Sequence, residues 1–186
     1  MQPMKSREFD PLRLDVAAFA KDGGALEGEW PLADLARLAE STLPGTAASA
    51  PAVTWRLTGE LRAAKGGESQ VWLHAAAQAT VHLECQRCLK PMTEALDAER
   101  SFLFVSGEDA AAELDSDSED DVLALTRALD ARELVEDELL LELPIVPRHD
   151  VCPDPIPVAT DDLPEEEAPH PFAKLAALKR GGGLPN

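Results

Sequence analysis

The chain has 186 residues, with 17 Lys and Arg against 35 Asp and Glu, which gives a formal net charge of −18. This length allows one domain with attached irregular segments, and a hydrophobic share of 45% is ordinary for a protein with a folded core. No apolar stretch approaches the roughly 20 residues of a membrane-spanning helix, so the sequence excludes an integral membrane protein. No apolar run follows Lys5 and Arg7, so we read no export signal and predict a cytoplasmic protein.

Apolar periodicity predicts one short helix and three strands in the first 105 residues. After an extended lead, residues 31–40 have Pro at a first helical position and apolar residues three apart, which predicts a short amphipathic helix. Alternating apolar and polar residues then predict two strands, over residues 53–61 and 71–83, joined by a hairpin at Gly66-Gly67. A third strand is predicted to end the segment 91–105.

The acidity is concentrated in the second part of the chain. Residues 1–105 hold 11 basic and 14 acidic side chains, whereas residues 106–186 hold 6 and 21. Residues 106–121 contain almost nothing to bury and predict a mobile acidic loop inserted into the domain. Because binding to nucleic acid needs basic side chains, only the first part could hold a patch for it, and the acidity indicates either solvation or docking to a basic partner.

A capped helix and an irregular tail complete the chain. Asp130 with Glu133 three residues later forms a capping-box pattern, and the apolar residues after it predict a helix that ends before Pro144. Its exposed side is expected to carry the acidic residues 136–138 and Glu142. Residues 153–186, rich in Pro and acidic residues, predict a tail with a short C-terminal helix that needs a docking partner. The apolar side of that helix consists of Phe172, Leu175 and Leu178.

These elements predict an α+β fold, with a small antiparallel β-sheet flanked by helices. Residues 1–152 are expected to form a single α+β domain, carrying the acidic loop insertion and followed by the irregular tail.

Cys85, Cys88, His149 and Cys152 combine a C-x2-C with an H-x2-C spacing. Thiolate and imidazole are the ligands that zinc prefers, and four of them leave no open position, so the set predicts one structural zinc ion. Free thiols without metal, or a redox-active pair of Cys85 and Cys88, remain open alternatives, although a turn between strands lacks the helix N-terminus that activates such pairs. His82 could also replace His149.

No nucleotide-binding, nucleophile-elbow or zinc-protease motif occurs, so we expect no enzymatic activity. Six basic side chains at or near the hairpin and dithiol turns are candidates for contacting RNA or another partner, provided that they converge on one edge. They are Arg62, Lys65, Arg87, Lys90, Arg100 and Arg148.

Three separated motifs occur in order along the chain: residues 83–89 (LECQRCL), residues 134–144 (LVEDELLLELP) and residues 171–175 (PFAKL). In combination they resemble the large ribosomal RNA subunit accumulation protein family, which is YceD-like, over roughly residues 10–180. The resemblance places Cys85, Arg87 and Cys88 in a C-x-R-C turn, Glu136, Asp137 and Glu138 in an acidic helix signature, and His149 and Cys152 in a second Cys or His cluster.

The resemblance implies a non-enzymatic cytoplasmic factor that supports accumulation or processing of the large-subunit (23S) rRNA, and hence ribosome assembly. Such a factor would bind rRNA through Arg87, Lys90 and their neighbours, or would bind a basic ribosomal protein, which the net charge of −18 favours at least equally. Two other functions remain open, a thiol redox protein that uses Cys85 and Cys88 and a protein–protein adaptor that docks through its C-terminal helix.

Overall fold

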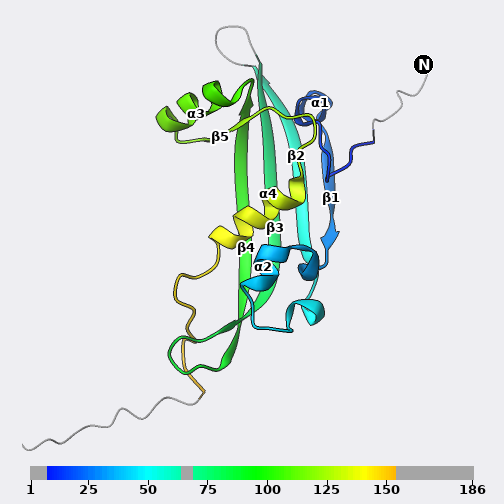
Figure 1. The fold of residues 1–186 in the computed structure, drawn as a ribbon. Helices are drawn as coiled ribbons and strands as arrows, with labels where there is room; N and C mark the ends of the chain where they lie inside the picture. The colour runs from blue at the N-terminus through cyan, green and yellow to red at the C-terminus, as the bar shows by residue number, and fades with distance from the viewer. Residues whose placement is uncertain (1–7, 64–68, 154–186) are drawn as a thin grey trace, which may run out of the picture. The chain divides into compact units, whose positions relative to one another are not determined.

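One five-stranded sheet organises the computed structural model, which describes residues 8–63 and 69–153 (Figure 1). Four strands follow one another as antiparallel neighbours, and the fifth joins the edge in parallel. The α+β class predicted from the sequence is therefore confirmed. The strands are β1 (Ala25–Trp30), β2 (Val53–Ala63), β3 (Ser69–Glu84), β4 (Pro91–Val105) and β5 (Asp121–Ala124), and the described helices are α1 (Val16–Lys21), η1 (Leu32–Asp34), α2 (Ala36–Glu40), η2 (Ala47–Ser49), α3 (Glu108–Asp117) and α4 (Ala131–Leu141).

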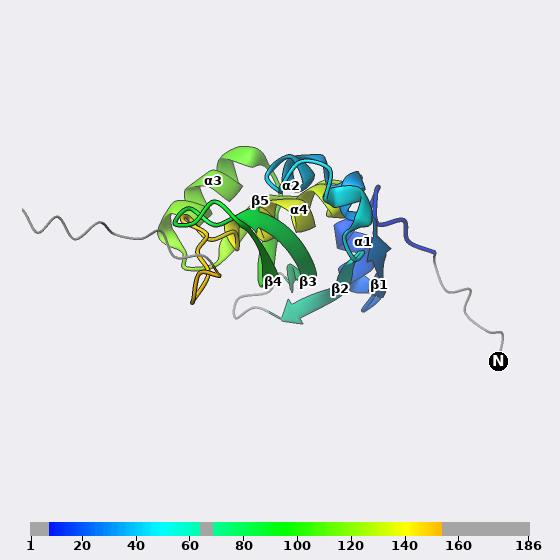
Figure 2. The ribbon, with the colours of Figure 1, turned by 90° about the horizontal axis from the view of Figure 1, so that it is seen from below.

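The main core lies between one face of the sheet and the helices α1, α2 and α4 (Figure 2). Alternate residues over Val53–Leu57 and Leu73–Leu83 are buried on this face, as the strand pattern predicted. Phe19 of α1, Leu38 of α2 and Leu139 of α4 pack against them and are fully buried. Because each such side chain stabilises the fold by roughly 1.5–3 kcal/mol when buried, this layer holds the helices on the sheet.

The acidic segment after β4 is mostly helical, so the loop predicted for residues 106–121 is wrong over the length of α3, Glu108–Asp117. Consecutive alanines favour a helix, and two acidic residues in its first turn interact well with the helix dipole. Ala111 is buried against Trp72 and Leu103, whose side chains alternate with those of the main core and point to the opposite face of the sheet. A small buried cluster, which also includes Val122, therefore anchors a segment that looked wholly solvated.

Two elements near the N-terminus were not predicted. The lead expected to be extended forms α1, where the Asp15 carboxylate accepts a hydrogen bond from Ala18 N at 3.0 Å. Strand β1 contains Gly28 and two glutamates, which are residue types depleted in strands. For this reason the sequence did not predict a strand there. The helix predicted for residues 31–40 starts as η1 and becomes α-helical only from Ala36.

The three predicted strands and the helix capped by Asp130 are confirmed. The Asp130 carboxylate accepts hydrogen bonds from Arg132 N at 2.9 Å and Glu133 N at 3.3 Å. Other predictions lie outside the described residues: the Gly66-Gly67 turn, Lys65, and the tail helix with Phe172, Leu175 and Leu178.

Glu136 corrects the prediction that the acidic side of α4 is exposed. Its side chain is buried, and Oε1 accepts hydrogen bonds from Arg37 N at 2.7 Å and Leu38 N at 3.1 Å, the free amides that begin α2. Oε2 accepts from the Arg37 guanidinium at 3.0 and 3.1 Å, and Asp137 pairs with the same guanidinium. Glu138 is largely buried as well and accepts from Arg100 Nε at 3.1 Å. The acidic motif thus fastens α4 to α2 and β4.

We expect Glu136→Ala to lower the free energy of unfolding by about 2 kcal/mol, because two buried amides and a guanidinium lose their acceptor. Asp137→Ala is the matched control, since Asp137 is about half exposed and its ion pair is worth less than about 1 kcal/mol. Urea unfolding measures both variants. Equal costs for the two would show that the buried carboxylate does not hold α2.

Candidate metal centre and open sheet face

The cysteine pair lies in the turn that joins β3 to β4, at one end of the sheet (Figure 1). Leu89 N donates to Cys85 O at 2.8 Å, and Cys85 N donates to Lys90 O at 3.0 Å, so the turn is closed by its own backbone. Gln86 N donates to Pro147 O at 2.8 Å, which pins the segment after α4 to the turn. The backbone therefore brings two stretches about 60 residues apart into contact.

All four predicted ligands meet at this junction. One ligand atom each from Cys85, Cys88, His149 and Cys152 lies within 4.8 Å of every other. Cys85 Sγ and Cys152 Sγ are 3.9 Å apart, and Cys88 Sγ and His149 Nδ1 are 3.4 Å apart. Around a tetrahedral zinc ion the corresponding separations are about 3.8 Å and about 3.6 Å. The donor set and its spacing therefore fit a closed four-ligand site.

The ring of His149 is oriented as a metal ligand needs. His149 Nε2 lies 3.1 Å from the carbonyl oxygen of Pro91. A carbonyl oxygen can only accept, so Nε2 carries a hydrogen; in the neutral ring the lone pair is then on Nδ1, which faces Cys88 Sγ. A second hydrogen bond of this kind is what orients histidine ligands in metal sites.

The surrounding backbone favours thiolate at one of the sulfurs. Burial alone would raise the pKa of the Cys85 thiol, but the N–H groups of His149, Arg87 and Cys88 point at its sulfur and lower the pKa from 9.0 to about 5. Burial raises the pKa of the Cys88 thiol. The site thus holds one sulfur ready as a thiolate beside a thiol that favours its proton.

The redox alternative gains the depressed pKa of Cys85 but meets an obstacle in access. Exposed fractions are 0% for Cys85, 8% for Cys88 and 7% for Cys152, whereas thiol–disulfide exchange requires an attacking group to reach sulfur. The three cysteines are free thiols. His82, named as a substitute ligand, instead lies 3.3 Å from Thr93 Oγ1 on the opposite face of the sheet and is not in the four-ligand group.

Two of the basic candidates lie away from this junction. Arg62 is near the other end of the sheet, where its guanidinium stacks 4.4 Å from the Trp72 ring centroid and pairs with Glu60 at 3.0 Å. Strand β3 separates that end from the cysteine turn by roughly 50 Å. Arg100 contacts Glu138 of α4 on the inner face of the sheet. The five basic candidates among the described residues therefore do not form one patch.

Arg87 belongs to the junction itself. Its Nε donates to Cys152 Sγ at 3.0 Å, and its Nη2 donates to the carbonyl oxygens of His149 at 2.8 Å and Asp150 at 3.4 Å. Arg148 lines an adjacent hollow of about 650 Å³, and Lys90 closes the turn through its backbone. The sequence placed these residues near the dithiol but did not indicate that Arg87 faces a sulfur.

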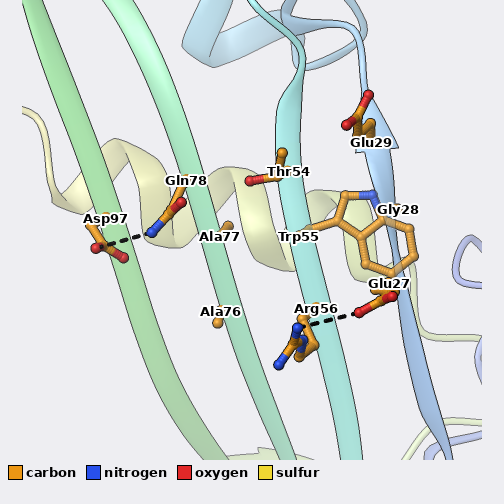
Figure 3. Close-up of a pocket in the computed structure, with 10 residues that line it drawn as sticks. All are labelled: Glu27, Gly28, Glu29, Thr54, Trp55, Arg56, Ala76, Ala77, Gln78 and Asp97. Carbon is orange, nitrogen blue, oxygen red and sulfur yellow. Dashed lines mark hydrogen bonds and ion pairs between the residues drawn. The ribbon is translucent and has the colours of Figure 1, made fainter.

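The sheet face opposite the main core carries a second candidate site, which sequence reasoning missed (Figure 3). A trough of about 570 Å³ crosses β1 to β4, and small residues such as Gly28 and Ala76 lie along it. A neighbouring hollow of about 380 Å³ shares Thr54, Gln78 and Asp97 with it and extends to Ala95. We call this combined surface the open-face trough.

The border of the open-face trough is acidic. Glu27, Glu29 and Asp97 line it against a single basic side chain, Arg56, which pairs with Glu27 at 3.3 Å (Figure 3). Gln78 Nε2 donates to Asp97 at 3.3 Å. The signal was present in the sequence, because these residues occupy the polar positions of alternating strands, but β1 had to be recognised first.

Comparison with known proteins decides the family. The family described as "Large ribosomal RNA subunit accumulation protein YceD" matches residues 73–179, more than half of the chain, including all four candidate ligands. The chain belongs to this family. The resemblance inferred from the three motifs is therefore confirmed, and the family name describes the accumulation of an RNA and not a catalysed reaction.

The large ribosomal RNA subunit accumulation protein YceD of Haemophilus influenzae is 37% identical over 117 residues, which is 59% of this chain and 66% of that relative. The chain thus spans just under two thirds of the relative's length. No solved structure matches the chain. Among the described helices, none has both the length and the apolar character needed to cross a bilayer.

Proposed function

We propose that this protein supports the accumulation or processing of large-subunit rRNA without catalysing a reaction, by binding a component of the assembling large subunit. Membership of the YceD family carries this proposal, since the family and the relative from Haemophilus influenzae are named for large ribosomal RNA subunit accumulation. The candidate metal centre adds support, because four protein ligands leave no position for a substrate. The proposal places the protein in the cytoplasm, where thiols stay reduced.

Depletion of the protein in cells should lower the large-subunit rRNA relative to the small-subunit rRNA and reduce the free large-subunit peak in a density gradient. Wild-type protein supplied in trans should restore both. Unchanged subunit ratios after complete depletion would contradict the proposed function, whatever the protein binds in vitro.

The proposed function includes one structural zinc ion held by Cys85, Cys88, His149 and Cys152. Donor chemistry, spacing and the orientation of His149 support it. When bound, zinc would supply a cross-link between the β3–β4 turn and the segment after α4. Without the ion, hydrogen bonds alone would hold this segment to the turn, among them those of Gln86 N, Arg87 and His149.

Purified reduced protein should contain about one zinc per chain, and zinc at 1,000 times its Kd should raise the free energy of unfolding by about 4 kcal/mol. His149→Asn should lose most of this gain, whereas the matched variant His82→Asn should keep it, because His82 is not among the ligands. Metal analysis and chelator-dependent unfolding measure the effect. Disulfide reductase activity in a protein that takes up no zinc would favour the redox alternative.

Of the two proposed contacts, a basic ribosomal protein is better supported than rRNA. The open-face trough combines three exposed carboxylates with one arginine that is already paired, so phosphates would be repelled there and Lys or Arg side chains attracted. Its small central residues leave room for side chains of an extended segment. The basic candidates Arg62, Arg87 and Arg100 all have partners within the protein, which leaves less basic surface for RNA.

Charge reversal on the open-face trough tests this contact. We expect the double variant Glu29→Lys and Asp97→Lys to weaken binding to purified basic large-subunit ribosomal proteins at least about tenfold at physiological salt. The control, Asp34→Lys with Glu40→Lys, makes the same charge change at exposed positions on the helical side and should bind normally. Tight binding of large-subunit rRNA fragments, with no ribosomal protein bound, would instead establish the RNA contact.

A further inference from the structure

Arg87 connects the two halves of the candidate metal centre. It lies between Cys85 and Cys88 in the β3–β4 turn, and its guanidinium reaches the other pair of ligands. Nε donates to Cys152 Sγ at 3.0 Å, while Nη2 donates to the carbonyl oxygens of His149 at 2.8 Å and Asp150 at 3.4 Å. One side chain from the turn thus contacts a ligand sulfur and the backbone that carries both distal ligands.

The net charge of the zinc-loaded centre gives a physical reason for the contact between Arg87 and Cys152. Three thiolates and a neutral imidazole around Zn²⁺ carry a net charge of −1, and the centre is largely buried from solvent. A buried surplus charge is costly unless an opposite charge is paired with it through hydrogen bonds. The guanidinium of Arg87 is such a partner, and its hydrogen bond to Cys152 Sγ is charge-assisted.

We propose that Arg87 is a positioning residue of the metal centre: its guanidinium neutralises the surplus negative charge and holds Cys152 Sγ and the His149 backbone where the ion binds. This inference rests on the proposed zinc site. Arginine suits the role better than lysine, because its planar fork reaches a sulfur and two carbonyl oxygens at once, whereas an ammonium supplies charge from a single point.

A role at the metal centre limits the ability of Arg87 to bind RNA. Its Nε and Nη2 donors face protein acceptors, so Arg87 is poorly placed to grip a phosphate through the same fork. A loss of RNA or protein binding in Arg87→Glu would therefore follow from damage to the metal centre. Any binding assay with an Arg87 variant needs the zinc content measured beside it.

Zinc affinity of the purified full chain, measured by competition with a chromophoric chelator, tests the proposal. Arg87→Gln should weaken zinc binding about 10- to 100-fold, the usual effect of removing a group that supports metal ligands. Arg87→Lys should fall between this variant and wild type, because the charge remains but the fork is lost. Arg148→Gln is the matched control: it removes the same charge next to His149, has no hydrogen bond to a ligand among the described residues, and should bind zinc within about threefold of wild type.

Two further measurements keep the outcomes distinct. Unfolding of the metal-free proteins should give the same stability for Arg87→Gln and wild type within about 1 kcal/mol, which separates a role at the metal from a role in the fold. The absorption spectrum of cobalt-loaded protein should report a tetrahedral site in wild type and Arg148→Gln, and an altered one in Arg87→Gln.

Equal zinc affinity in wild type and Arg87→Gln would overturn the role of Arg87 alone. Absence of zinc binding in wild type would overturn both this inference and the proposed metal site, while the depletion experiment would still test the ribosomal function.

Discussion

The antiparallel pairing of β3 with β4 is the constraint on which the rest of the structure depends. The two strands pair from Val71 and Phe104 to Glu84 and Pro91, and this register fixes which side chains face the helices and which face away. A shift by one residue would turn the buried alternate positions outward and empty the core. The same register sets the cysteine turn at the end of the hairpin, so the core and the candidate metal centre are consequences of one alignment.

Two polar junctions then fasten the remaining chain to this sheet. Glu136 ties α4 to the start of α2, and the group around Cys85 ties the segment after α4 to the β3–β4 turn. Both join residues far apart in sequence, so each closes a long loop, and both place an arginine guanidinium on a buried acceptor. The acceptor is the Glu136 carboxylate in the first junction and Cys152 Sγ in the second.

Local patterns predicted the local features well. Alternation identified β2 and β3, the capping pattern at Asp130 located α4, and two paired spacings selected the four ligands that the structure brings together. The features that escaped depend on contacts between distant residues. Glu136 looked like one more solvated acid, because only α2, 99 residues away, shows why it is buried. Residues 108–117 looked solvated because their helix depends on Trp72 and Leu103.

Contacts between distant residues also determine which arginines are available to bind a partner. Sequence alone counted Arg62, Arg87 and Arg100 as available basic groups, but each has an acceptor within the fold: a carboxylate for Arg62 and Arg100, and a sulfur for Arg87. An arginine already paired in this way must break those hydrogen bonds before it can bind a phosphate, and this lowers the favourable free energy of phosphate binding. The carboxylates at the border of the open-face trough outnumber the one arginine there. A basic side chain can therefore bind them with less loss of existing ion pairs. Internal pairing therefore leaves fewer arginines free to bind phosphates, which favours the proposed contact with a basic polypeptide over a contact with RNA.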